Sequence, residues 1–387
     1  MAAHAACLQE RINYMPRIPF IEARLGLAEE SPKAIERRLT DYLTSLRAKR
    51  RSGKAGGPSP EGHDAADQSS LIPDPGFDDR KYPSKEDLYR IQSRSNKLFE
   101  RRRAASGLQH LNRQELDRLS VLRDGVRLVP VETEHRADEL AAELHVAMPW
   151  MAAATEEVWM ALRRSAAAGE PGARIPPLLL DGPPGIGKTV WARRLGELLG
   201  VPSDAIDASG EPASFSVTGL QKGWSGAAPG RPVELILRTL VGNPIVVVDE
   251  IEKTGQVHSN RGQSHSMTEG LLPLLEPASA RRWSCPAFRV VFDMSWVSWI
   301  LLSNSIAPLP EPLLSRVRIV RLEPPSLDHL IQFAWEEGRR RDLQTVSIEA
   351  VEEGIRRLVF DKGEISLRTV IRLLERAKFL ERRPPLN

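Results

Sequence analysis

Cysteine, aromatic residues and long apolar runs are all scarce in this sequence. Its 387 residues include only two cysteines, Cys7 and Cys285, which lie far apart along the chain. Neither a disulfide framework nor a cysteine-based zinc site is therefore expected. Aromatic residues make up 5% of the chain, and no apolar run approaches the ~18 residues that cross a bilayer. We therefore expect neither a membrane span nor a membrane partner.

No secretory leader is expected either. Residues 1–11, MAAHAACLQER, contain no apolar core of the kind that a signal peptide requires. This N-terminus predicts a cytoplasmic protein. The formal net charge of +3 is too small to indicate a nucleic-acid partner by itself.

Composition and hydrophobic periodicity divide the chain into five segments. Residues 1–49 are a short N-terminal segment, and residues 50–80, rich in Gly, Pro, Ser and Asp, have the composition of a flexible linker. Residues 81–135 are basic and helical. Short Val, Ile and Leu runs alternate with helices over residues 136–324, which predicts a mainly parallel sheet covered by helices. Residues 325–387 show helical periodicity only and are expected to form an all-α subdomain.

The expected fold class is therefore α/β, with a C-terminal all-α subdomain and a helical, partly disordered N-terminal region. A helix is expected over residues 233–240. The strands expected in the sheet span residues 177–180, 214–217, 245–248, 299–303 and 317–322.

The basic segment contains two sequences typical of capped helices. Ser84 and Asp87 begin one, and Asn112 and Glu115 begin the other, each as a capping box. A solvated basic face is the favoured interpretation, because no aromatic residues interleave with the cations as stacking platforms for bases. A nucleic-acid site stays open as the alternative. The cations in question are Arg94, Lys97, Arg101, Arg102, Arg103, Arg113, Arg118, Arg123 and Arg127.

One stretch, GPPGIGKT at residues 182–189, does not read as ordinary core or loop. It lies between an expected strand and an expected helix and matches the P-loop pattern, whose backbone N–H groups surround phosphate oxygens. Glycine is needed there because the backbone turns through conformations that a Cβ disfavours. We expect Lys188 to bind the β and γ phosphates of ATP and Thr189 to bind Mg²⁺. The nucleotide-binding residues predicted in this loop are Gly182, Pro183, Pro184, Gly185, Ile186, Gly187, Lys188 and Thr189.

Two carboxylates follow the buried run at residues 245–248. A metal-and-water site beside a P-loop requires acidic groups at the end of such a strand. We expect Asp249 to hold Mg²⁺ and Glu250 to polarise the attacking water. The alternative, an acidic helix cap, is disfavoured because a P-loop lies about 60 positions earlier.

These motifs resemble those of AAA+ ATPases and, among them, the ATPase module of the Lon family. The resemblance covers residues 176–377, about half of the chain. Residues 249–253, DEIEK, are similar to the family's Walker B extension. Residues 219–231, GLQKGWSGAAPGR, are similar to its pore-loop segment, and residues 292–304 are similar to the stretch that ends in sensor 1.

The resemblance implies roles for three further residues. Asn304 matches sensor 1, which helps to orient the attacking water. Arg316 matches the arginine finger that reaches the γ-phosphate in a neighbouring subunit, and Arg368 matches the sensor 2 arginine of the helical lid. Donors of this kind stabilise the charge that spreads over the phosphoryl oxygens during transfer. A finger supplied by a neighbour implies a homo-oligomer, expected to be a hexameric ring.

Trp224 matches the pore-loop aromatic that grips an extended polypeptide in the centre of such a ring. Ser225 replaces the aliphatic residue that usually follows it. The alternative is that Trp224 packs on a neighbouring loop. The pore interpretation predicts a protein substrate or partner.

The expected function is an ATP-hydrolysing motor that remodels or threads protein. One alternative remains open, an ATPase that acts on nucleic acid as a loader or switch through the basic N-terminal helices. An assembly scaffold or signalling switch with little turnover is disfavoured because Glu250, Asn304 and Arg316 are all present. Lon proteins continue into a Ser-Lys protease domain, whereas this sequence stops at Asn387, so an ATPase module without protease activity is expected. His258 and His265 have no helical metal-ligand spacing, so a flexible polar loop is expected there and no metal beyond Mg²⁺.

Overall fold

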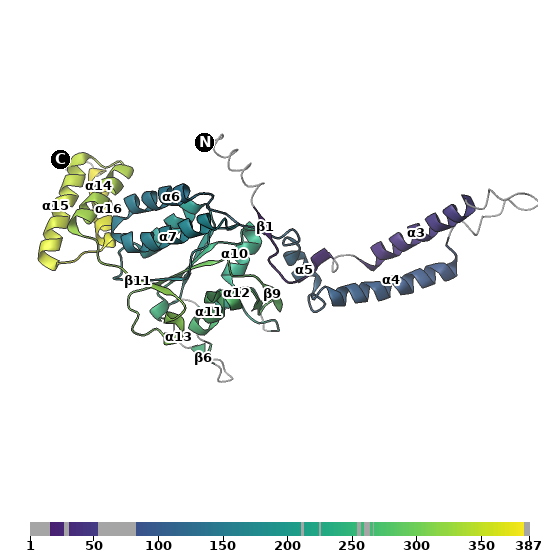
Figure 1. The fold of residues 1–387 in the computed structure, drawn as a ribbon. Helices are drawn as coiled ribbons and strands as arrows, with labels where there is room; N and C mark the ends of the chain where they lie inside the picture. The colour runs from purple at the N-terminus through teal and green to yellow at the C-terminus, as the bar shows by residue number, and fades with distance from the viewer. Residues whose placement is uncertain are drawn as a thin grey trace, which may run out of the picture. The chain divides into compact units, whose positions relative to one another are not determined.

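The computed structural model describes residues 16–26, 31–52, 83–209, 213–223, 226–253, 257–258, 264–265 and 267–382. The chain forms two compact units, one of residues 23–123 and one that combines residues 1–22 with 124–387 (Figure 1). Among its described residues, the regular secondary structure of the first unit is all helix. The second contains the sheet and the C-terminal helices.

Three helices account for most of the smaller unit. Helix α3 (Pro32–Ser52) packs against α4 (Lys85–Ala105), and α5 (Arg113–Ser120) follows. Both predicted capping boxes, at Ser84 and at Asn112, are confirmed. Arg47 of α3 and Asp87 of α4 form an ion pair of 2.7 Å. The backbone N–H of Ser84 and the Arg47 guanidinium lower the pKa of Asp87 to about 2.

A five-stranded parallel sheet forms the centre of the larger unit, which confirms the predicted fold class. Its strand order is β11-β3-β10-β5-β4. The strands are β3 (Leu178–Asp181), β4 (Ser203–Asp207), β5 (Ile245–Asp249), β10 (Ser298–Ser303) and β11 (Arg318–Arg321). In register, Ile300 of β10 lies beside Leu178 of β3 and Val247 of β5. All of these strands therefore end at one common edge.

Both faces of the sheet are buried, as its apolar strands require. Alternate residues such as Leu178 and Leu180 pack in one core with α6 (Glu134–Ala147), α7 (Ala152–Ala167) and α8 (Lys188–Leu199). The intervening residues, such as Leu179 and Val246, are fully buried on the other face. Figure 1 shows α11 (Met267–Leu275), α12 (Pro277–Ala280) and α13 (Glu311–Leu314) on the side away from α6 and α7.

The predicted strand over residues 214–217 is wrong. These residues belong to helix α9 (Ala213–Thr218), which packs against α11. The fifth strand of the sheet is instead β4, which lies at the edge and in which only Ile206 is buried. A run of four residues with two apolar side chains fits a helix turn as well as a strand, and an exposed edge strand needs little apolar character. The expected helix at residues 233–240 is α10 (Arg231–Thr239).

Three C-terminal helices form a small subdomain with its own core. They are α14 (Leu327–Arg340), α15 (Thr345–Lys362) and α16 (Leu367–Glu381). Leu330, Ile348, Ile355 and Leu374 are buried between them. This is the all-α subdomain that the helical periodicity predicts.

Short elements complete the larger unit. Residues near the N-terminus are part of it, because β1 (Arg17–Ile18) pairs with β2 (Val126–Arg127) and Phe20 packs edge-on against Phe292 at 5.4 Å. None of the helices among the described residues is both long and apolar enough to cross a membrane. The other short elements are η1 (Pro149–Met151), η2 (Ile251–Lys253), β6 (Val257–His258), β7 (Ser264–His265), β8 (Trp283–Cys285) and β9 (Val290–Phe292).

Candidate functional site

The loop of residues 182–187 joins the end of β3 to the start of α8. Gly185 and Gly187 have φ angles of +80° and +93°, which L side chains rarely adopt. A Cβ on Gly185 would also lie 2.7 Å from the Cβ of Ser366. The backbone N–H of Leu367 donates to the Gly185 carbonyl at 3.0 Å, so the helical subdomain is bonded directly to this loop.

Lys188 is the first residue of α8, and only 7% of it is exposed. Its ammonium donates to the carbonyl oxygens of Gly182 at 2.5 Å and Pro183 at 3.2 Å, and to Asn304 Oδ1 at 3.1 Å. Burial lowers the pKa of Lys188, and the nearby carboxylate of Asp249 opposes that shift. Lys188 is therefore a buried cation inside the loop, and its ammonium contacts Asn304 at the end of β10.

Thr189 and Asp249 meet across the carboxyl ends of two strands. The Thr189 hydroxyl donates to Asp249 Oδ2 at 2.7 Å, and the other carboxylate oxygen accepts the backbone N–H of Glu250 at 2.9 Å. A hydroxyl and a carboxylate oxygen at this separation are hard oxygen ligands of the kind that Mg²⁺ prefers. The donor set that the structure assembles therefore fits Mg²⁺.

Glu250 follows β5 with a φ of +54°, an uncommon conformation for a residue other than glycine. Its carboxylate pairs with the Lys253 ammonium at 2.7 Å. The positive φ directs the chain sharply away from the strand. The strain is of the kind that tertiary structure maintains at functional sites.

Glu252 was not singled out by the motifs, yet it holds Asn304. Its Oε1 accepts the Asn304 backbone N–H at 3.2 Å and the side-chain Nδ2 at 2.8 Å. The Asn304 Oδ1 then faces Lys188. Glu252 Oε2 is buried without a hydrogen-bond partner in the part of the chain that the structure describes. The signal available in the sequence was the third acidic residue of DEIEK, at residues 249–253.

We expect Glu252→Ala to lower the turnover number about tenfold with little change in KM for ATP. Alanine removes both hydrogen bonds from Asn304, and the one from Nδ2 orients the side chain. A hydrogen bond to a charged acceptor is worth about 1.5 kcal/mol, which is roughly a factor of ten in rate. Glu252→Gln keeps the Oε1 acceptor and should recover most of the activity. Steady-state ATP turnover of both variants provides the measurement. Equal losses in the two variants would contradict a positioning role for the Oε1 hydrogen bonds.

A cavity of about 630 Å³ lies at the carboxyl edge of the sheet. Predicted residues from the loop, from β5, from β10 and from the helical subdomain all reach it, Arg368 among them. Arg368 makes no hydrogen bond or ion pair with any residue that the structure describes. The predicted residues that line the cavity are Pro184, Gly185, Gly187, Lys188, Thr189, Asp249, Glu250, Asn304 and Arg368.

The helical subdomain contributes a charged group that the motifs did not indicate. Glu337 is 7% exposed and pairs with Arg340 and with Arg341, the latter at 2.7 Å, and all three residues line the cavity. Apolar side chains from both parts line it as well: Met148, Phe333, Leu367 and Ile371. Only the tertiary structure brings α14 to the phosphate loop, so no local pattern marked these residues.

Trp150 joins the loop to the helical subdomain. Its indole Nε1 donates to the Ile186 carbonyl at 2.8 Å, and its ring lies edge-on to Phe333 at 6.1 Å and tilted against His329 at 5.9 Å. No sequence motif marks the stretch around Met148. The structure places it between the phosphate loop and α14.

Arg316 does not line this cavity. It follows α13, where its Nη1 donates to the Pro312 carbonyl at 2.8 Å and its Nη2 lies 3.7 Å from Glu276 Oε2. About a third of the side chain (35%) is exposed. Within a single chain, Arg316 therefore stands apart from the other predicted site residues.

Trp224 and Ser225 lie outside the described residues. The segments on both sides of them are described: Gly219 and Pro229 form an antiparallel bridge, and the Lys222 N–H donates to the Pro286 carbonyl at 3.1 Å. His258 and His265 lie on strands β6 and β7, whose backbones pair antiparallel. Their side chains are outside the description.

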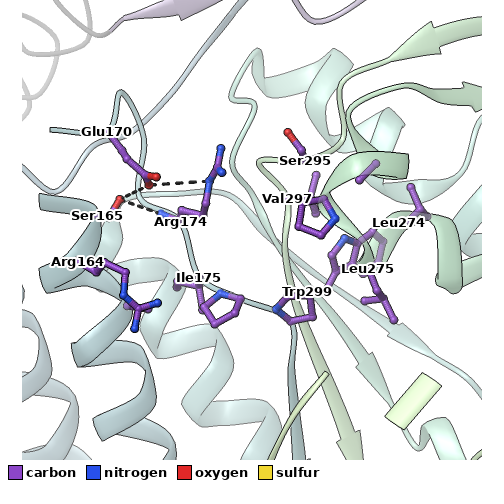
Figure 2. A pocket seen from close by; sticks show the side chains of 15 residues that line it. Arg164, Ser165, Glu170, Arg174, Ile175, Leu274, Leu275, Ser295, Val297 and Trp299 are labelled. Atoms are coloured by element: carbon purple, nitrogen blue, oxygen red, sulfur yellow. Dashed lines mark hydrogen bonds and ion pairs between the residues drawn. The ribbon is translucent and has the colours of Figure 1, made fainter. Parts of the chain in front are cut away.

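A second, smaller cavity of about 200 Å³ lies at the amino ends of β3 and β10 (Figure 2). Its lining includes Arg174 and Trp299. Ser165 donates to Glu170 at 2.8 Å, and the Arg174 guanidinium lies over the Trp296 ring at 4.1 Å. Because the strands are parallel, this cavity is at the opposite edge of the sheet from the phosphate loop and contributes nothing to that site.

Comparison with known proteins agrees with this geometry. Residues 178–324 match the family model described as ATPase family associated with various cellular activities (AAA). The chain is 34% identical over 153 residues to the peroxisomal Lon protease homolog 2 of Spinacia oleracea, which covers 40% of this chain and 17% of that protein. It is 30% identical over 220 residues to the Lon protease of Koribacter versatilis, covering 54% of this chain and 26% of that protein.

A third relative, the Lon protease of Magnetococcus marinus, is 28% identical over 228 residues, which cover 54% of this chain and 27% of that protein. The chain thus spans 17% to 27% of the length of these curated relatives. The matches confirm the resemblance that the motifs indicated.

Proposed function

Because residues 178–324 have the AAA P-loop fold within a Lon-like ATPase region, we propose that this protein hydrolyses ATP to ADP and phosphate. One observation carries the proposal. Lys188, Thr189, Asp249, Glu250, Asn304 and Arg368, which come from four separate parts of the chain, line a single cavity. Those residue types in one place supply what phosphoryl transfer requires: cations, oxygen ligands for a metal, and a carboxylate for water.

Each group has a part that follows from its position. Lys188 exchanges its loop carbonyl partners for the β and γ phosphates, and the backbone N–H groups at the start of α8 bind phosphate oxygens. Thr189 and Asp249 would hold Mg²⁺, which neutralises charge on the phosphate oxygens. Glu250 accepts a proton from the attacking water, while Asn304 and Arg368 orient the water and the γ-phosphate.

The apolar side chains of the same cavity suit the adenine ring. Met148 comes from the segment before η1, Phe333 from α14, and Leu367 and Ile371 from α16. A flat base between apolar side chains buries its faces without leaving polar groups unpaired. Base binding would then join the helical subdomain to the sheet. The buried Glu337 with its two arginines lies on the same side and would meet the ribose or phosphates.

We place Arg316 at the boundary between neighbouring subunits of a homo-oligomeric ring, expected to be hexameric. The position of Arg316 outside its own cavity supports a role in trans. A cation that completes the neighbour's site makes hydrolysis depend on assembly. An isolated subunit would therefore turn over ATP slowly.

We propose that this ring remodels or threads protein substrates and that it does so in the cytoplasm. The pore-loop resemblance around Trp224 supports a polypeptide substrate. An indole ring offers a large, rigid apolar surface that suits a chain whose sequence changes as it passes.

Substitution of Trp224 tests this proposal. We expect Trp224→Ala to keep the basal ATPase rate and to lose the stimulation of that rate by an unfolded protein. Steady-state ATP turnover with and without a permanently unfolded protein is the measurement, and Trp296→Ala, at the amino edge of the sheet, is the matched control. A Trp224→Ala protein that responds to unfolded protein as the wild type does would contradict the pore role. Stimulation by DNA alone would favour the nucleic-acid alternative.

A further inference from the structure

The smaller cavity, at the amino ends of β3 and β10, combines charged and apolar side chains (Figure 2). Its apolar lining includes Leu274 and Leu275 from the end of α11 and Val297, which directly precedes β10. Its charged lining comes from α7 and from the segment that joins α7 to β3. We refer to this space of about 200 Å³ as the amino-edge cavity.

Arg174 brings hydrogen-bond donors to the amino-edge cavity that no described residue accepts. Its Nε is buried without a hydrogen-bond partner, because its ion-pair partner, Glu170 Oε2, lies 3.9 Å away, beyond hydrogen-bond range. The face of the guanidinium lies over the Trp296 ring at 4.1 Å. A guanidinium that stacks on an aromatic ring in this way keeps its planar edge of N–H groups for a bidentate acceptor.

Two further donors belong to the lining. Arg164 of α7 is exposed and makes no hydrogen bond or ion pair with any residue that the structure describes. Trp299 of β10 is 1% exposed, and its indole Nε1 is buried with no acceptor among the described residues. Folded proteins pair nearly all of their buried donors. The lining therefore has an excess of donors, which favours a ligand that carries an acceptor.

The net charge of the lining is +1. Arg164 and Arg174 are its cations, and Glu170 is the only acidic residue among the described residues of the lining, so two positive charges less one negative charge leave +1. Glu170 Oε2 accepts a hydrogen bond from the Ser165 hydroxyl at 2.8 Å. Its carboxylate is thus engaged with its own neighbours. A ligand with a single negative charge would balance the lining.

We propose that the amino-edge cavity binds a small organic acid, with one carboxylate on a short aliphatic body. Arg164 and Arg174 bind the carboxylate, because a guanidinium matches the two oxygens of that group. Leu274, Leu275 and Val297 contact the aliphatic body, which leaves water for an apolar surface. This ligand and its site go beyond the proposed ATPase, since the nucleotide cavity lies at the opposite edge of the sheet.

A carboxylate suits this cavity better than a phosphate group, the other anion that arginine binds with two hydrogen bonds. A phosphate group carries a charge of about −1.5 to −2 at neutral pH, which exceeds the charge of the lining. The acid must also be short, because pockets for drug-sized ligands have volumes of about 300–1,000 Å³. Isocaproate, a branched aliphatic acid with one carboxylate, meets these requirements.

Isothermal titration of the full-length protein with isocaproate, in the absence of ATP, tests the proposal. Isocaproamide has the same shape without the charge and should bind about tenfold more weakly, because a charge-assisted hydrogen bond is lost. Acetate keeps the charge without the branched body and should bind about 100-fold more weakly, because each apolar carbon contributes to burial. The wild-type protein should therefore prefer isocaproate to both.

Two variants test the arginines separately. Arg164→Gln and Arg174→Gln should each lower the affinity for isocaproate about tenfold and change the affinity for isocaproamide little. Arg194→Gln, on α8, removes the same charge elsewhere and should change neither affinity. Arg164 is exposed on α7, so its replacement should leave the fold intact. Thermal unfolding checks the Arg174→Gln protein, which loses the stacking on Trp296.

Several results would overturn the proposal. One is the absence of saturable binding of isocaproate at about 10 mM. Another is an equal affinity of the wild-type protein for the acid and its amide. Equal losses for acid and amide in Arg164→Gln would show that this arginine does not bind the carboxylate. Competition by ATP would place the acid in the nucleotide cavity instead.

The titration measures neither ATP hydrolysis nor the response to unfolded protein. Failure to bind isocaproate therefore leaves the ATPase proposal unaffected. Failure of the Trp224 test likewise leaves the amino-edge cavity unaffected.

Discussion

Replacing Lys188 by alanine is expected to abolish detectable ATP binding. Lys188 is a buried cation in the phosphate loop, and its ammonium is held by two loop carbonyls and Asn304. Two charge-assisted hydrogen bonds to phosphate at about 2 kcal/mol each correspond to a loss of about 10³-fold in affinity. Equilibrium titration with a fluorescent ATP analogue measures this loss.

Arg194→Ala is the matched control for that experiment. Arg194 lies on the same helix, pairs with Glu197 at 3.1 Å and is 46% exposed in its side chain. Its loss should leave the affinity for ATP unchanged. Thermal unfolding without nucleotide shows whether the Lys188→Ala protein is folded. Near-normal affinity in a folded Lys188→Ala protein would contradict the assignment of the P-loop.

The second large effect is expected for Arg316→Ala. Because Arg316 lies outside the cavity of its own chain, ATP binding should stay nearly intact. Turnover should fall by about 10³-fold, the lower end of the range for arginine fingers. Titration and steady-state hydrolysis of the same preparation separate the two effects. A parallel loss of binding and turnover would place Arg316 in the nucleotide site itself.

Mixing two inactive variants tests whether Arg316 acts across a subunit boundary. Glu250→Gln should bind ATP and hydrolyse little of it, because the carboxylate that we propose polarises water is gone. In a mixed ring with Arg316→Ala, some boundaries pair an intact Glu250 with an intact Arg316, so hydrolysis should partly return. Native mass spectrometry confirms that mixed rings have formed. No recovery in such rings would refute the trans role.

The sequence alone was enough to predict the phosphate loop and the strand β5 beside it. Residues 182–189 specify a turn between strand and helix because glycines occupy positions that need positive φ, and Gly185 and Gly187 have it. The run at residues 245–248 is apolar at every position, which is typical of a strand buried on both faces. The fold class and the two capping boxes followed from equally local rules. The roles of Glu250, Asn304, Arg316 and Arg368 stay predictions.

Other features were decided only by tertiary structure. Residues 214–217 form a helix, and β4 is a strand because of its position beside β5, although its own sequence is polar. Glu252 can bond to Asn304 only because the fold brings η2 close to the end of β10. Arg341 lines the cavity only because α14 packs near the phosphate loop. Local propensity records the preferences of a few neighbouring residues. The partners of an edge strand, a buried carboxylate or a cavity wall come from elsewhere in the chain, so their energies appear only when the chain is folded.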